Sequence, residues 1–452
     1  MFLAEIVLAS RILGLVAGEQ RVEVQADAAV RSIEVQRDGV TVAALHRPPW
    51  SAVVNFGLEL APHELTVVAF DQAGNELGRD TQAINVARPP AEFGILFDRD
   101  AEGQVTAAIR ASHFAHRLPK NVTVKLDGRV IRKNRNLTTY SLGTVNLSTI
   151  HVLDVEVEFP DRIRSRKEVV FGGHAGFSEQ VPSEMTPVAV RQRKAPGGAT
   201  ADCFRLGTQL LPPVTIERGD GTAHFILNGS RGVMKGNEAP EHRSDARFAL
   251  PDVEIDIVNP VAEAIQLPGS LTRLFNSQSM SGKKGTRRAL AMAVTPEGHT
   301  QIADAVGAAA LRALRGGSRR VVVVVIGSAP APDLSVHRPD FMRRYLERVG
   351  VPLRVWSLTG PRPDLAETWG EVKDVSTAAL LLAATEDLRQ ELNAQRVAWM
   401  PVGTANAYRV IATSDCAYEP LAGVGLALKS SDSRLKSSDQ RLTPSDRAAS
   451  AR

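Results

Sequence analysis

Histidine side chains at two places in this chain have a spacing that could hold a metal ion. His113 and His116 are three residues apart, and His63 and His151 occupy matching positions in two similar segments. Imidazole nitrogens bind metals, but a site needs further ligands at a suitable spacing. No carboxylate pattern accompanies His113 and His116, so we expect both on the surface. His63 and His151 are typical of a polar residue that begins a strand, and we expect them to be structural.

Sequence motifs of catalysis are absent from this chain. It contains no nucleophile elbow, phosphate-binding loop, HExxH sequence or EF-hand loop. Cys203 and Cys416 do not lie in CxxC pairs, which argues against a zinc site or a thioredoxin-like motif. We therefore expect a protein that is not an enzyme, and an enzyme with an unfamiliar site is the weakest alternative.

Length and composition are those of a globular protein. The 452 residues accommodate roughly two to four domains, and 43% of them are hydrophobic and 23% charged. The net charge is +4, and no basic face with interleaved aromatic residues is present, which argues against nucleic acid as a partner. No uninterrupted apolar run reaches transmembrane length, so we expect no membrane span.

The segment 298–332 combines a helix pattern with the most apolar run of the chain. Residues 321–326 are six consecutive β-branched residues, which predicts a central strand of a parallel sheet with helices on both faces. The run stops at Gly327 and Ser328, and the carboxyl edge of such a sheet is where ligands bind. The preceding helix buries one face, made of Ile302, Val306, Ala309, Ala310, Ala313 and Leu314.

Strand and helix patterns alternate around this segment, which predicts a doubly wound α/β domain. We expect Ser376 to cap the last helix. The strand candidates are residues 224–227, 253–258, 289–294, 352–358, 397–402 and 408–413, with 253–258 at an edge or half-buried; the helix candidates are residues 301–314, 339–352 and 374–395.

The first part of the chain is all-β and contains a repeat. Short apolar or alternating runs are separated by turn signals such as Asp38-Gly39. Asp127 follows Asp38, and His151 follows His63, at almost the same interval, which indicates a tandem duplication. The order VEVQADAAVRSIEVQRDGVTVAAL, RPPWSAVVNFG and PHELTVVAFDQAGNE resembles bacterial immunoglobulin-like modules. The resemblance implies two β-sandwiches, at residues 20–89 and 90–172.

Three further segments complete the predicted organisation. Residues 1–19 are compatible with either an export signal or a first strand. Residues 173–202 lack sustained periodicity and are rich in Gly, Pro, Ser and Thr, which predicts a linker. Residues 421–452 carry the repeat LKSSDSR and LKSSDQR, which predicts a disordered tail. The α/β domain is expected at 203–420, with a helix and strands at its C-terminal end.

The α/β segment resembles a von Willebrand factor A-like domain, a family with a metal-ion-dependent adhesion site at the carboxyl sheet edge. The family pattern is Asp-x-Ser-x-Ser after the first strand, a Thr in a Gly-x-Thr loop and a later Asp. The matching positions here are Asn228, Ser230, Gly232, Thr300 and Gly327. Only Ser230 and Thr300 keep the family's residue types, so the resemblance implies a degenerate metal site.

Two hydroxyls and an amide supply no negative charge to offset the dehydration of Mg²⁺. We therefore expect no bound cofactor, with weak Mg²⁺ binding by Asn228, Ser230 and Thr300, aided by Asp252 or Asp340, as the alternative. Without metal, we expect Thr300 to cap the helix and Ser230 to cap or turn the loop after the first strand. We expect Asp304 to lie in the first helical turn, where the helix dipole favours a carboxylate. The residues expected to line a partner-binding edge are Asn228, Ser230, Thr300 and Ser328.

The same resemblance bears on the cysteines, because the two ends of A-like domains lie close together. A disulfide between Cys203 and Cys416 is therefore one alternative, and two buried free thiols are the other.

We expect a non-catalytic protein that binds a protein partner through the sheet edge, with a metal-dependent adhesion module as the alternative. The expected location is secreted, periplasmic or in the cell envelope, since a disulfide would require export.

Overall fold

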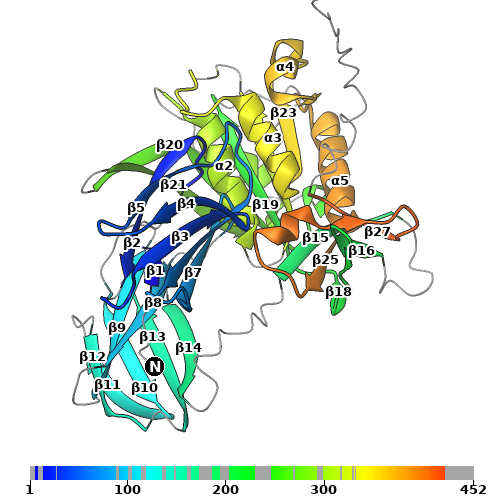
Figure 1. Ribbon diagram of the computed structural model, residues 1–452. Coiled ribbons are helices and arrows are strands. Elements are labelled where there is room, and N and C mark those ends of the chain that lie inside the picture. The colour runs from blue at the N-terminus through cyan, green and yellow to red at the C-terminus, as the bar shows by residue number, and fades with distance from the viewer. Residues whose placement is uncertain are drawn as a thin grey trace, which may run out of the picture.

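The structure is a computed structural model of the whole chain. It describes residues 6–8, 14–26, 28–87, 91–99, 104–113, 119–134, 139–146, 149–159, 164–172, 186–193, 203–229, 246–267, 270–292, 299–315, 318–327, 330 and 332–422. These residues form two β-sandwiches, a small antiparallel β-unit and an α/β unit (Figure 1). Most of the predicted tail and most of the predicted linker lie outside the described residues, but Leu421, predicted to begin the disordered tail, is buried and its N–H donates to the Ala189 carbonyl at 2.9 Å.

The first sandwich consists of a three-stranded sheet, β1-β2-β5, and a four-stranded sheet, β4-β3-β6-β7, both antiparallel. Residues 6–8 form its first strand, and Ile6 and Leu8 are buried in its core. The strands are β1 (Ile6–Leu8), β2 (Glu19–Ala26), β3 (Ser32–Arg37), β4 (Val40–Leu45), β5 (Ser51–Asn55), β6 (His63–Phe70) and β7 (Glu76–Ile84).

The second sandwich repeats the first strand for strand. Its sheets are β8-β9-β12 and β11-β10-β13-β14, so each strand has a counterpart seven places earlier. The hairpins β3–β4 and β10–β11 turn through Asp38-Gly39 and Asp127-Gly128, all four residues with positive φ, as a two-residue hairpin turn requires. The strands are β8 (Ala91–Arg99), β9 (Gln104–His113), β10 (Asn121–Leu126), β11 (Arg129–Asn134), β12 (Thr139–Thr144), β13 (Ile150–Glu158) and β14 (Arg164–Gly172).

The α/β unit is built on a six-stranded sheet in the order β21-β20-β19-β22-β23-β24, in which only β21 is antiparallel. Its elements are β19 (Gly221–Asn228), η1 (Ala246–Phe248), β20 (Val253–Leu267), β21 (Ser270–Ser281), η2 (Gly282–Lys284), α1 (Gly285–Met292), α2 (Ile302–Ala313), β22 (Arg319–Ile326), α3 (Pro339–Val349), β23 (Leu353–Ser357), η4 (Pro363–Leu365), α4 (Ala366–Trp369), β24 (Val372–Asp374) and α5 (Ala378–Ala394).

Helices cover both faces of this sheet, as the apolar run predicted. Every residue of β22 is buried; α2 and α3 pack on one face, and α1 and α5 on the other.

Three local predictions were wrong. Residues 289–292 belong to helix α1, because Thr286, Ala289 and Leu290 are buried at helical spacing. β20 lies between β19 and β21 rather than at an edge. Thr377, not Ser376, caps α5 and accepts from the Leu380 N–H.

The small β-unit differs most from the predicted organisation. Residues 186–192, within the predicted linker, form β15 and pair with β25 and β27 from the far end of the chain. The segment 203–420 is therefore not a single domain, because its two ends build a separate core with β15. The elements are β15 (Thr186–Gln192), β16 (Phe204–Leu206), β17 (Gln209–Leu210), β18 (Thr215–Glu217), β25 (Gln395–Met400), η5 (Asn406–Arg409), β26 (Ile411–Ala412) and β27 (Tyr418–Pro420).

The first sandwich packs against helices α2 and α3, and the second sandwich lies beyond it (Figure 1). Leu60, in the loop before β6, is 2% exposed and joins the apolar core of the α/β unit. The Tyr345 hydroxyl donates to the Asn85 carbonyl (3.0 Å), and Arg348 donates to the Leu60 carbonyl (3.1 Å) and pairs with Glu59. Among the described residues, no helix has the length and apolar character needed to span a membrane.

Candidate functional site

The predicted partner-binding edge lies where the strand order of the α/β sheet reverses, at the carboxyl ends of β19 and β22. Asn228 ends β19 and is buried, and its carbonyl accepts from the Gly327 N–H at 2.7 Å. Thr300 lies in the loop before α2 and is fully buried. Of the other predicted edge residues, Ser230 and Ser328 lie outside the described residues, as does Gly232.

Thr300 does not cap helix α2, contrary to the prediction. Its N–H and its hydroxyl both donate to the Pro332 carbonyl, at 3.0 and 3.2 Å, and its own carbonyl accepts from the Leu334 N–H at 2.7 Å. The cap comes from Asp333, whose carboxylate accepts from the N–H groups of Ile302 (2.9 Å) and Ala303 (3.3 Å). A carboxylate at this position also suits the positive end of the helix dipole.

Asp304, in the first turn of α2, fixes the other end of the same loop. Its carboxylate accepts from the N–H groups of Val336 (2.9 Å) and His337 (3.2 Å) and from His337 Nδ1 (2.8 Å). Burial alone would raise the pKa of Asp304, but the hydrogen bonds from His337 and Val336 outweigh burial and lower this pKa overall. In return, Ser335 Oγ accepts from the Asp304 N–H at 3.1 Å.

Side chains alternate along the loop of residues 332–337, which we call the pinned loop. Asp333, Ser335 and His337 make the contacts to α2, and the two residues between them are aliphatic and face solvent. Leu334 is 53% exposed and Val336 is 71% exposed. The loop is therefore held in one conformation while it presents two apolar side chains at the sheet edge.

Potential metal ligands are not gathered in the described part of this edge. Among the described residues, no three His, Cys, Asp or Glu side chains are grouped as a metal site requires. The two carboxylates that were candidates to complete such a site both face arginines. Asp252 precedes β20 at the amino end of the sheet and faces Arg218 at 3.7 Å. Asp340 lies in α3 and pairs with Arg338 and Arg344 at 3.0 and 3.1 Å.

His63 and His151 have the structural role expected of them. His63 Nδ1 donates to Asp38 (2.7 Å), and its Nε2 lies 3.1 Å from the Phe56 carbonyl oxygen. His151 Nδ1 donates to Asp127 (2.8 Å), and its Nε2 lies 3.0 Å from the Asn146 carbonyl oxygen. His113 ends β9; His116 lies outside the described residues.

Sequence reasoning missed a buried polar cluster beneath α2. His224 of β19 donates to Asp256 of β20 at 2.9 Å, and Arg312 of α2 approaches the same carboxylate oxygen at 3.8 Å. Burial raises the pKa of Asp256, but His224, Ser277 and Arg312 together lower it overall. The only signal in the sequence is a polar residue at one inward position of each of the two strands.

Two consecutive arginines that begin β22 were also missed. Arg319 donates to the carbonyls of Gly219, Asp252 and Leu392, at 3.1 to 3.3 Å, and so reaches the C-terminal end of α5. Arg320 donates to the carbonyls of Gly350 (3.1 Å) and Val349 (3.4 Å) at the end of α3. The two side chains leave the strand on opposite faces, so each anchors the helix end on its own face. Both are buried.

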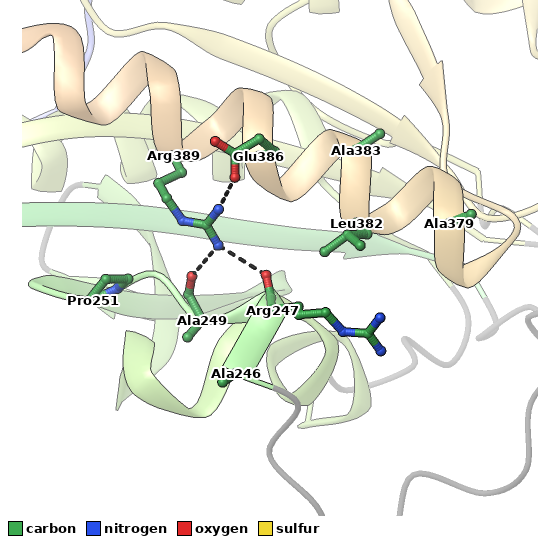
Figure 2. A pocket seen from close by; sticks show the side chains of 9 residues that line it. All are labelled: Ala246, Arg247, Ala249, Pro251, Ala379, Leu382, Ala383, Glu386 and Arg389. Carbon is green, nitrogen blue, oxygen red and sulfur yellow. Dashed lines mark hydrogen bonds and ion pairs between the residues drawn. The ribbon is translucent and has the colours of Figure 1, made fainter.

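A groove of about 690 Å³ lies between η1 and the first half of α5 (Figure 2). Its α5 side presents Ala379, Leu382 and Ala383, and Arg389 closes one end. Arg389 pairs with Glu386 and donates to the carbonyls of Arg247 (3.0 Å) and Ala249 (2.8 Å). Since these partners occupy its guanidinium, the groove offers a ligand mainly apolar contact.

Cys203 and Cys416 are joined by a disulfide, with their Cα atoms 5.4 Å apart. Both cysteines are buried in the core of the small β-unit. The bond connects the segment that enters the α/β unit to the segment that leaves it. It is thus the first of the two alternatives for these cysteines.

No protein-family model and no curated protein sequence matches this chain. Among solved structures, the chain is similar to fibronectin(III)-like modules of Clostridium thermocellum CbhA, with 14% identity, 37% of this chain and 94% of that chain covered, and a TM-score of 0.16. For the central fibronectin-III array of RIM-binding protein, the identity is 9%, the coverage 44% and 81%, and the TM-score 0.20. For a β-glycosidase from Bacteroides vulgatus, the identity is 7%, 37% of this chain and 24% of that chain are covered, and the TM-score is 0.19. Similarities of this size carry no argument about function.

Proposed function

We propose that this chain is a non-catalytic protein that binds a protein partner through the pinned loop at the carboxyl edge of its α/β unit. The observation that carries the proposal is the exposure of Leu334 and Val336 on a backbone that hydrogen bonds hold in place. Aliphatic side chains on a rigid segment lose little conformational entropy on binding, and they gain from leaving water.

The resemblance to A-like domains supports the same edge, because that family binds partners there. In this chain the edge works without a metal ion. The Thr300 hydroxyl donates its hydrogen to the Pro332 carbonyl, and the carboxylates of Asp333 and Asp304 accept from backbone N–H groups. The first sandwich, packed on α2 and α3, acts as a brace for the unit. The disulfide is compatible with a secreted, periplasmic or cell-envelope location.

A photo-crosslinking amino acid at position 336, in the cells that naturally make the protein, tests the proposal. We expect a discrete cross-linked protein from position 336 and none from position 58, whose leucine is 90% exposed on the first sandwich. The same cross-linked pattern from both positions, or none from position 336, contradicts the proposal.

Titration with Mg²⁺ or Mn²⁺ tests the metal-dependent alternative. We expect no change in the melting temperature of the purified protein. A clear rise that Thr300→Ala abolishes would establish metal binding at this edge in place of the metal-free contact.

A further inference from the structure

A second groove, of about 680 Å³, lies at the amino end of β23, away from the pinned loop. Helices α3, α4 and α5 and the start of β23 contribute to its walls. Its apolar lining includes Leu346, Val351, Trp369 and Leu388. The groove therefore follows the edge of the sheet between the two helix layers.

The edge of β23 is open at this groove. β24 pairs with residues 355–357 of β23, and none of the described residues pairs with Leu353 on that side. The Pro352 carbonyl accepts from Val322 on one side, whereas the Ser357 carbonyl accepts from Val375 on the other. Because peptide groups alternate in direction along a strand, the N–H and C=O of Leu353 face the groove. Such groups can pair with an added extended segment.

Charged side chains of both signs line the groove, and two of its carboxylates, Glu347 and Glu371, are exposed to solvent. Arg191 and Arg354 both pair with Glu391, at 2.6 and 2.8 Å, and Lys373 pairs with Asp387. Arg343 of α3 has no ion pair or hydrogen bond to any described residue, and its Nε is buried without an acceptor.

The backbone beside Arg343 leaves room for its guanidinium. Gly370 has φ +81°, and a Cβ atom there would lie 3.1 Å from Arg343 Nη1. The groove thus combines one cation that lacks a partner, one open position of a strand edge and an apolar lining.

We propose that this groove binds an extended peptide segment of a partner protein that carries a carboxylate close to an aliphatic side chain. The carboxylate pairs with Arg343, because a guanidinium binds carboxylates through two parallel hydrogen bonds. The peptide backbone pairs with Leu353, and the aliphatic side chain packs on the side chains of Leu353 and Trp369. The site is independent of the pinned loop, so either contact can fail without the other.

Selection of a phage-displayed library of random linear dodecapeptides on the full-length protein tests this proposal. We expect the selected peptides to share an Asp or Glu close to Val, Leu or Ile. Arg343→Gln should weaken binding of the best synthetic peptide about tenfold or more, as measured by fluorescence polarisation. Arg338→Gln is the matched control, since Arg338 precedes the same helix, has a side chain that is 83% exposed and does not line the groove, so its loss should not alter affinity.

A change in the peptide makes the test independent of how the variant folds. Replacing the acidic residue of the peptide by its amide should weaken binding to the wild-type protein by a similar factor, and Arg343→Gln should add little further loss. Selected peptides without acidic residues, an amide peptide that binds as tightly as the acidic one, or unchanged affinity in Arg343→Gln would each overturn the proposal.

Discussion

His151 of β13 donates a 2.8 Å hydrogen bond from its Nδ1 atom to the Oδ2 atom of Asp127, in the β10–β11 turn of the second sandwich. Asp127 Oδ1 also accepts from the Val152 N–H at 2.9 Å. The first sandwich has the same pair of contacts, in which Asp38 accepts from His63 and from the Glu64 N–H. The duplicated residues therefore make the same contacts. Each pair joins a hairpin turn, β3–β4 or β10–β11, to a later strand of the same sandwich, β6 or β13.

The pair in the second sandwich predicts a pH dependence. The hydrogen bond from His151 lowers the pKa of Asp127 below 3.8, and the hydrogen bond to Asp127 raises the pKa of His151 above 6.5. The His151 contribution to stability is complete below pH 6.5 and is lost as pH rises through its folded-state pKa. The Asp127 contribution is complete above pH 3.8 and is lost as pH falls through its folded-state pKa.

His151→Gln should therefore lower the free energy of unfolding most between pH 3.8 and pH 6.5. We expect a loss of roughly 0.2–1 kcal/mol near pH 5 and a smaller one near pH 8.5, because Asp127 is half exposed to solvent. Urea unfolding at both pH values measures the difference. His46→Gln, at an exposed position of the same sandwich type, is the control and should show no pH-dependent difference. An effect of His151→Gln that is equal at both pH values contradicts the charged pair.

Arg320 should be among the most sensitive positions of the α/β unit. Burial lowers the pKa of its guanidinium, and its donors satisfy the carbonyls at the end of α3. Arg320→Leu leaves these carbonyls without partners, so we expect a loss of about 3–5 kcal/mol in the free energy of unfolding. Denaturant titration gives the value, and Arg338→Leu on the exposed helix end should change stability by less than about 0.5 kcal/mol.

Asp333 is predicted to stabilise both α2 and the pinned loop. Asp333→Ala removes the acceptor for two N–H groups of the first helical turn, which should cost about 1–2 kcal/mol. Asp364→Ala serves as comparison, since Asp364 pairs only with its near neighbour Arg362 on the surface. Thermal unfolding should show a clear shift for the first variant alone, and equal shifts would remove Asp333 as the cap.

Leu60 should hold the first sandwich on the helices. Leu60→Asp places a charge in the core that Leu60 shares with α2 and α3, so we expect a loss of at least about 3 kcal/mol. Leu58→Asp, two residues earlier at a position 90% exposed, should be nearly neutral. Urea unfolding compares the two. Similar losses for both variants would mean that the sandwich is not docked through Leu60.

Reduction of the Cys203–Cys416 bond should destabilise the protein. The bond closes a loop with a sequence separation of 213 residues, for which the chain-entropy relation gives about 5 kcal/mol. Unfolding with and without a reductant, with Cys203→Ser/Cys416→Ser as the permanently reduced form, measures the effect. Two alkylatable thiols in the native, unreduced protein would show that the bond does not form.

Periodicity in the sequence predicted the elements whose burial is set locally. The run that became β22, the helical faces of α2 and α3 and the repeated Asp and His positions all follow from spacing alone. The error at α1 arose because a six-residue apolar run fits a strand and a helix equally well. The error at β15 arose because a short strand with partners about 200 residues away has no local signature of its own.

The sequence by itself predicted two duplicated sandwiches and a parallel sheet whose carboxyl edge carries Asn228, Thr300 and Gly327 rather than carboxylates. Only the tertiary structure decided what the sheet edge carries instead. Asp333 lies 31 residues from the N–H group it caps, and Asp304 reaches forward across β22 to fix the same loop. Contacts of this kind depend on how strands and helices pack, so spacing along the chain does not reveal them. The same holds for Arg343, whose lack of a partner among the described residues is visible only once their charges have been placed.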